Sequence, residues 1–213
     1  QFFRQNFSQV TNPPIDSLRE RHVMSLRTRF SNLANILDEQ DQNDHVLVLE
    51  SPVLLSADWA RLKSAFGKLA GEIDCTFDPH AGFEELRAAI TRIRREAEEA
   101  VRGGQTELFL TDENISADRC AIPMVLAAAA VHTHLVRKGL RAFSSINVRT
   151  AECLDTHYYA VLIGVGATTV NAYLAEAAIA ERHGRDLFGD LSLDDCLANF
   201  RTAIDDGLLK IIG

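Results

Sequence analysis

The sequence has little positive charge and no long apolar run. Its 213 residues include 22 Lys and Arg against 30 Asp and Glu, which gives a net charge of −8. Phosphate binding depends on clustered Lys and Arg, so this balance argues against a nucleic-acid-binding surface. A membrane-spanning helix needs about 18 consecutive apolar residues, and no run reaches that length. We therefore expect a soluble protein with neither nucleic acid nor a membrane as a partner.

Cysteine is scarce and scattered, and no two cysteines form a CxxC pair; the four are Cys75, Cys120, Cys153 and Cys196. A local iron–sulfur or zinc motif needs closely spaced cysteines, so we predict no metal ligand in this chain. With no secretory signal, four scattered cysteines favour reduced, structural thiols in the cytoplasm over disulfides.

The sequence also lacks an initiator Met, and both of its ends are apolar, with Phe2-Phe3 at the start and Ile211-Ile212 near the finish. We expect both ends to be cuts through a longer protein. Function can then reside in parts that lie outside this chain.

Two regions are expected along the chain: an N-terminal segment, residues 1–55, packed on a main body, residues 56–213. A proline pair predicts a turn and then a helix from about Ile15 to Phe30. Residues 38–45 are polar throughout and are typical of a loop. A short apolar run, Val46–Leu49, predicts a strand.

The main body repeats a helix, a glycine and a strand. Gly67, Gly103 and Gly139 each follow a helical pattern, where glycine commonly forms a left-handed cap. A strand-like run follows each of them: Ile73–Phe77, Leu108–Thr111 and Phe143–Val148. Such repeats predict an α/β fold with a mainly parallel sheet of βα units. The spacing resembles that of a βα barrel, so we expect a half-barrel, a degenerate TIM-like barrel or an open sheet with the same winding.

The helical patterns between these glycines support the same fold class. An amphipathic helix is predicted from Phe83 to Val101, with Arg and Glu opposite its apolar face. The next, Ile122–Lys138, is apolar nearly all round, with Pro123 in its first turn, and is therefore predicted to be buried. A last helix is predicted to begin at Ser192, which forms a capping-box pattern with Asp195.

In a barrel-like sheet a site is built at the carboxyl ends of the strands. The candidate residues there are Asp78, Asp112, Glu113, Asn114, Arg149 and Glu152. Asp112 and Glu113 could act as acid and base, but adjacent loop residues usually point apart, and turn and capping roles explain them better. We therefore predict no catalytic residue among them.

Histidines and a glycine pair are the other candidates. His132 and His134 lie two positions apart on a helix, on opposite sides, so they cannot hold one metal ion. His157 has no nucleophile near it in the sequence. Gly164-Val165-Gly166 follows an apolar run, as in a dinucleotide fingerprint, but Thr169 stands where the third glycine belongs. A tight turn is the better interpretation, so no cofactor-binding residue is predicted.

One run near the start, Gln9–Asp16, reads QVTNPPID. Further runs follow at residues 49–54, 73–77, 121–124, 130–136, 162–167 and 170–174. In order and spacing, and over almost the whole chain, these runs are similar to the central domain of the large subunit of glutamate synthase, and QVTNPPID is the most specific of them. The resemblance implies a non-catalytic domain that connects the glutaminase and FMN synthase domains of the same chain and helps to shape an ammonia tunnel. The family's central domain is also similar in topology to its FMN domain.

The parent enzyme implied by the resemblance makes L-glutamate from L-glutamine and 2-oxoglutarate with FMN, an iron–sulfur cluster and a small FAD-containing subunit. NADPH is the expected electron donor, and the sequence leaves NADH and ferredoxin open. In that family the glutaminase nucleophile is an N-terminal cysteine and the cluster is held by grouped cysteines. Here position 1 is Gln and the cysteines are scattered. This sequence therefore has neither the family's nucleophile nor its iron–sulfur ligands, and no cofactor is predicted in this chain. The alternatives are an independent dinucleotide-binding α/β enzyme domain and a pure interaction module.

Overall fold

The computed structural model describes residues 23–30, 32 and 46–213. Five parallel strands form its main sheet, in the order β3 (Val53–Leu54), β9 (Thr169–Asn171), β8 (Ser145–Arg149), β6 (Glu107–Thr111) and β4 (Ala70–Asp74). Antiparallel pairs join β1 (Thr28–Phe30) to β2 (Leu47–Leu49) and β5 (Thr76–Phe77) to β7 (Cys120–Ala121). The predicted α/β class with a mainly parallel sheet is confirmed.

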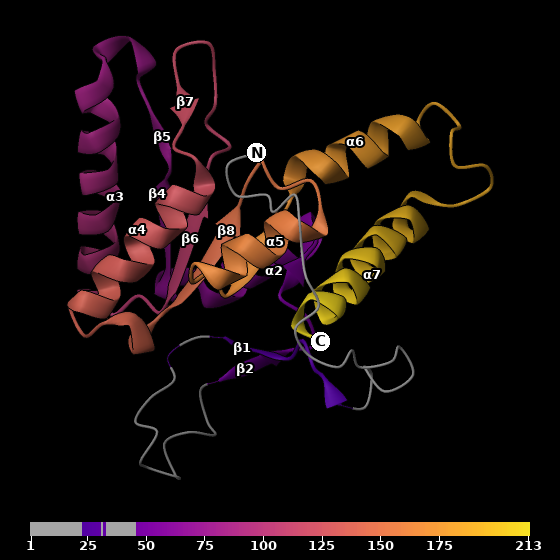
Figure 1. Cartoon of the computed structure of the whole chain (residues 1–213), viewed down its shortest axis with the longest axis horizontal. Coiled ribbons are helices and arrows are strands. Elements are labelled where there is room, and N and C mark those ends of the chain that lie inside the picture. The colour runs from indigo at the N-terminus through magenta and orange to yellow at the C-terminus, as the bar shows by residue number, and fades with distance from the viewer. Residues whose placement is uncertain (1–22, 31, 33–45) are drawn as a thin grey trace.

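Helices connect the strands in the right order for βα units. They are α2 (Ser56–Phe66), α3 (Phe83–Arg102), α4 (Met124–Arg137), α5 (Thr156–Gly164), α6 (Tyr173–His183) and α7 (Leu193–Ile212), with short 3-10 turns at Gly67–Leu69, Pro79–Ala81 and Arg141–Phe143. In Figure 1, α4 and α5 lie in front of the strands and α2 lies behind them. Strands β4, β6, β8 and β9 lie side by side in the sheet in the same order as in the chain, which is the arrangement of a barrel. The described strands nevertheless form an open sheet.

The sheet has one apolar face because successive side chains of a strand point to opposite sides. Leu108, Leu110, Ile146, Val148 and Val170 are fully buried on this face. They share one core with residues of α3, α4, α5 and α7, including the fully buried Ile93, Leu135 and Leu162. The buried alanines of α4 let that helix approach the strands closely, as its composition predicts.

The opposite face is mostly polar and packs against α2. Trp59 of α2 meets Phe109 of β6 edge to face, with ring centroids 4.8 Å apart, and Leu54 completes this small apolar cluster. Around it, Asn147 donates to Glu107 over 3.1 Å and accepts from Thr169 over 2.7 Å. These three side chains are completely buried.

Helix ends follow their sequence signals in most places. Ser192 and Asp195 form the predicted capping box at the start of α7. Gly67 and Gly139 have positive φ, as predicted, but Gly103 has a φ of −77° and the positive φ falls on Gly104. The expected left-handed cap after α3 is therefore displaced by one residue. Pro123 precedes the first residue of α4 as its N-cap.

Three predicted elements need correction. The helix expected to reach Phe30 does not, because Thr28–Phe30 form β1; residues 15–22 and the polar loop at 38–45 lie outside the described residues. The run Ile73–Phe77 is divided at Cys75 between the parallel sheet and the β5–β7 pair. Phe143 belongs to a 3-10 turn and not to the strand that begins at Ser145. The predicted strand near residues 46–49 is present as β2.

Candidate functional site

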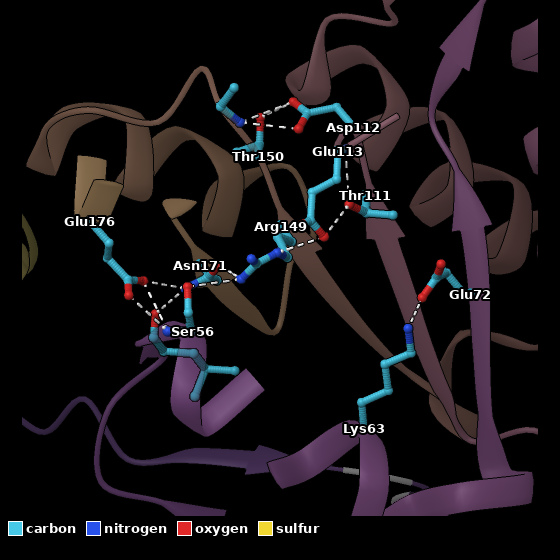
Figure 2. A network of polar contacts seen from close by, with 12 residues as sticks. Ser56, Lys63, Glu72, Thr111, Asp112, Glu113, Arg149, Thr150, Asn171 and Glu176 are labelled. Atoms are coloured by element: carbon cyan, nitrogen blue, oxygen red, sulfur yellow. Dashed lines mark hydrogen bonds and ion pairs between the residues drawn. The ribbon is translucent and has the colours of Figure 1, made fainter. Parts of the chain in front are cut away.

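The carboxyl ends of β6, β8 and β9 bring together a polar cluster around Arg149 (Figure 2). Arg149 is the last residue of β8, and register places it beside Thr111 of β6 and Asn171 of β9. Its Nη1 donates to Asn171 Oδ1 over 2.5 Å and to Ser56 Oγ over 3.0 Å. The strand order alone therefore assembles this cluster from segments far apart in the sequence.

Glu113 and Tyr173 complete the surroundings of the Arg149 guanidinium. Nε lies 2.7 Å from Glu113 Oε2, an ion-pair distance, although its N–H is not aligned for a hydrogen bond. The guanidinium carbon lies 5.1 Å from the centre of the Tyr173 ring, which is within cation–π range. The positive charge of Arg149 is thus matched by a carboxylate and an aromatic face of the same chain.

Glu176 holds the end of the edge strand on the other side of the cluster. Asn171 Nδ2 donates to Glu176 Oε1 over 2.6 Å and to the Leu54 carbonyl over 2.9 Å. Both carboxylate oxygens of Glu176 accept from the Ser56 backbone N–H over 3.0 Å. Glu176 therefore satisfies a backbone donor at the start of α2, where a negative charge is favourable.

Asp112 is a buried carboxylate with a structural set of partners. It accepts from Thr150 Oγ1 over 2.6 Å and from the Ala151 backbone N–H over 3.1 Å. Burial raises the pKa of Asp112 above its usual value, and the hydrogen bond from Thr150 opposes that rise. Asp112 and Glu113 have different partners, which agrees with the expectation that adjacent loop acids point apart.

The remaining predicted edge residues lie outside the Arg149 cluster. Glu152 accepts from the Met124 backbone N–H over 2.8 Å and from Tyr158 Oη over 2.7 Å, so it caps the start of α4. Asp78 accepts from the His80 backbone N–H and begins a 3-10 turn. Asn114 lies in the exposed loop after β6.

The two histidines of α4 contact different neighbours, as their spacing predicts. His132 Nδ1 accepts from Arg141 Nε over 3.1 Å, and burial followed by the nearby charge of Arg141 lowers the pKa of His132. His134 lies 2.7 Å from Glu98 of α3. Hydrogen bonds from His134 and Arg102 lower the pKa of Glu98 to about 2. His157 lies in the first turn of α5.

Gly164 and Gly166 lie at the end of a helix and not at the start of one. The apolar run before them is α5, and Gly166, with a φ of +116°, turns the chain toward β9. A Cβ at this glycine would lie 2.3 Å from His132 Cγ. A phosphate-binding fingerprint instead needs glycines between a strand and the N-terminus of a helix. The tight-turn interpretation is confirmed.

Ser56, Asn171 and Glu176 were missed by sequence reasoning. Asn171 is a neutral residue within a three-residue strand, and Ser56 lies 120 residues from Glu176. No local pattern marks such a pair. The short polar interruptions after buried strands are the only sequence signal that could have drawn attention to them.

The described side chains do not gather into a metal site. Among residues 23–30, 32 and 46–213, no three His, Cys, Asp or Glu residues are grouped to hold an ion. Cys75, Cys153 and Cys196 are buried separately, and Cys120 is exposed. In the same described part of the chain, no helix has the length and apolar character that crossing a membrane requires.

Comparison with known proteins gives a consistent result over the full sequence. The family model described as "Glutamate synthase central domain" matches residues 1–213. The chain is 64% identical over 211 residues to the NADPH glutamate synthase large chain of Azospirillum brasilense. It is 38% identical over 225 residues to the chloroplastic ferredoxin-dependent glutamate synthase of Spinacia oleracea, and 33% identical over 222 residues to the NADH glutamate synthase of Saccharomyces cerevisiae. Each alignment covers 99% of this chain but only 14%, 14% and 10% of those relatives.

Proposed function

We propose, since this chain belongs to the family of glutamate synthase central domains, that it is a non-catalytic domain connecting the glutaminase and FMN synthase domains of a larger polypeptide. In this role it helps to shape the path by which ammonia passes between them. The parent enzyme then makes L-glutamate from L-glutamine and 2-oxoglutarate.

The observation that carries the non-catalytic assignment is the pairing of the acidic and basic side chains around the carboxyl edge. Arg149 is matched by Glu113, Asn171 and Ser56; Asp112 is matched by Thr150 and Ala151. Glu152 and Glu176 satisfy backbone donors at helix starts. Catalysis needs groups that contact a reacting atom, whereas these groups bind other residues of the same chain.

The cofactors implied by the family do not fit the residues of this chain. The Arg149 guanidinium, the group at this edge best suited to a phosphate, is already paired with a carboxylate, and the glycine pair lies at a helix end. The cysteines are separate from one another. We therefore assign FMN and the iron–sulfur cluster to other parts of the parent polypeptide, and no chemical step to this chain.

The remaining features of the parent enzyme are proposed from its relatives. The NADPH enzyme of Azospirillum brasilense has the highest identity among those given above, so we propose NADPH as the electron donor. A small FAD-containing subunit and a cytoplasmic location complete the proposal. The family match over the entire chain supports this proposal over an unrelated interaction module, and the position of Gly164 and Gly166 at a helix end supports it over a dinucleotide site.

The isolated chain tests this proposal. We expect the purified 213-residue protein to melt cooperatively, to show no flavin absorbance after incubation with FMN and gel filtration, and to turn over neither glutamine nor 2-oxoglutarate. The intact large chain, assayed in parallel, is the positive control. Stoichiometric flavin retention or turnover that Arg149→Met abolishes would overturn the non-catalytic assignment.

A further inference from the structure

A groove of about 370 Å³ lies where the end of α7 meets α5 and the segment before β1. We call it the α5–α7 groove. Leu208 and Ile211 line it from α7, Ile163 lines it from α5, and Leu26 lines it from the segment before β1. A dry apolar cavity of ~150 Å³ is already large enough to bind benzene. The α5–α7 groove can therefore accommodate more than one large side chain.

The chemistry of the lining selects apolar side chains as its occupants. Among the described residues that line the groove, Arg27 is the one with a charge, and its Nε donates to Glu50 over 3.1 Å. The hydroxyl groups of Ser25, Thr28 and Thr168 each form a hydrogen bond within the chain. A polar occupant would therefore lose its hydrogen bonds to water without replacing them, whereas an apolar one would not.

The open side of the α5–α7 groove leaves large apolar side chains exposed. Ile211 and Ile212 have 53% and 61% of their surface accessible, while Leu208, one turn before Ile212, is only 3% accessible. Exposed apolar side chains beside an apolar groove mark a surface on which another segment packs.

The end of α7 determines which segment lies nearest to the groove. Gly213 is the C-cap of α7, and its N–H donates to the Leu209 carbonyl. A Cβ at Gly213 would lie 2.8 Å from Met24 Cε, so the end of the helix packs against the segment before β1. Glycine commonly ends a helix, and one of the next residues then often makes an apolar contact with the last turn. Here that last turn carries Ile211, a residue of the groove.

We propose that the residues directly after Gly213 in the parent polypeptide turn at this glycine and fill the α5–α7 groove with apolar side chains. The inference rests on the proposed connecting role, in which the polypeptide continues beyond Gly213. The covalent bond to Gly213 holds this segment at the rim of the groove at a high effective concentration, an advantage that a second copy of the chain lacks. In this arrangement the groove fixes the direction in which the polypeptide leaves the domain.

Photo-crosslinking from α5 identifies the occupant. Gly164 lines the groove, has no left-handed backbone conformation, and has no atom within 4 Å of the position of a Cβ. A crosslinking side chain, p-benzoylphenylalanine, can therefore begin in open space there. In the intact large chain we expect the main crosslinked peptide from position 164 to contain the residues directly after Gly213. Gly184, an exposed right-handed C-cap of α6, is the matched control and should give no such peptide.

Amide hydrogen exchange of the intact large chain gives a second measurement. Gly164→Arg places a charge in the apolar groove and should displace the segment. We expect the amides directly after Gly213 to exchange at least about tenfold faster in this variant than in the unsubstituted chain. Gly184→Arg should leave their exchange unchanged. Unchanged exchange in β6 and β8 shows that each variant keeps its fold.

Each other outcome overturns the proposal in a distinguishable way. A main crosslink from position 164 to a distant part of the large chain would overturn this occupant and leave the connecting role intact. A crosslink between two copies would assign the groove to self-association. Crosslinks confined to residues 1–213, with unchanged exchange in Gly164→Arg, would show that nothing beyond Gly213 enters the groove. Flavin retention or turnover by the isolated chain would instead overturn the proposed function, whichever segment fills the groove.

Discussion

The two faces of the main sheet are built from the same strands and differ in nearly every property. One face carries Leu108, Leu110, Ile146, Val148 and Val170, which pack against four helices. The other carries Glu107, Asn147, Thr169, Arg149 and Asn171, whose side chains bind one another across strands. Burial on the first face is non-directional and supplies most of the stabilisation. The stability of the second face depends on hydrogen bonds between specific residues of adjacent strands. These bonds favour the observed order of the strands.

The polar strand ends also bear on the proposed non-catalytic role. A polar strand end in a parallel α/β sheet is the usual place for a site, and the Arg149 cluster occupies that place. Its hydrogen bonds, however, join β3, β8, β9 and the start of α2. In this domain the polar face adds specific hydrogen bonds between elements, of which β3, β8 and β9 also contribute side chains to the apolar core.

The largest expected effect comes from the apolar face. Leu110→Ala should lower the free energy of unfolding by about 3 kcal/mol, because it removes fully buried contacts and leaves a cavity. Urea unfolding followed by circular dichroism measures the change. Leu126→Ala is the matched control, since Leu126 is exposed on α4 and should change stability by less than about 0.5 kcal/mol. Equal effects at the two positions would contradict the assignment of the core.

Arg149→Met tests the polar face and should cost less, about 1–2 kcal/mol, because Glu113 can be solvated once its partner is lost. The cost arises mainly from Asn171 and Ser56, which lose a charged donor. Arg185→Met removes an exposed i, i+4 pair with Glu181 and serves as the control, with an expected change of at most about 0.5 kcal/mol. An increase in the free energy of unfolding of Arg149→Met would show that the cluster is strained and does not stabilise the fold.

Glu152→Gln should have a smaller effect, about 0.5–1 kcal/mol, because an amide oxygen can still accept from the Met124 N–H while the favourable charge at the start of α4 is lost. Thermal melts of the two proteins at the same pH measure the difference. No change in melting temperature would mean that the carboxylate charge contributes nothing to α4.

The smallest effect concerns pH and His132. The pKa of His132 is lowered in the folded state, so the unfolded chain takes up a proton first as the pH falls. Its contribution to stability is therefore complete above the ordinary histidine pKa of about 6.5 and declines below it. His132→Gln, which keeps an acceptor for Arg141, should show a weaker loss of melting temperature between pH 7.5 and 5.5 than the parent protein. Parallel pH profiles would contradict this role for His132.

The repeated order of helix and strand could be predicted from the sequence. The helix α5 and the short strand β9 could not. The spaced glycines predict β4, β6 and β8 because a glycine cap is a local signal. A short apolar run such as residues 160–164 suits either a buried helix or a buried strand, and here it forms the second half of α5. Strand β9 has only three residues and depends on pairing with β8, so its own pattern is too short to predict it.

The sequence predicted which residues lie at the candidate site but not which residues they contact. Asp112, Glu113 and Arg149 were identified because they follow predicted strands. Their contacts could not be predicted, because Arg149 meets Ser56 across 93 positions of sequence and Asn171 meets Leu54 across 117. The division into residues 1–55 and 56–213 stays a prediction, while β3 from the first part is an edge strand of the main sheet.

Steady-state glutamate formation by the intact large chain carrying Arg149→Met, measured well below its melting temperature, tests most directly the claim that the carboxyl edge is structural. We predict that kcat/KM stays within about threefold of the parent enzyme, because Asn171, Ser56 and Glu113, which contact the guanidinium among the described residues, all belong to this domain. A loss of about a hundredfold or more with an unchanged melting temperature would contradict the claim, since an effect of that size is typical of a group that acts on the reacting atoms.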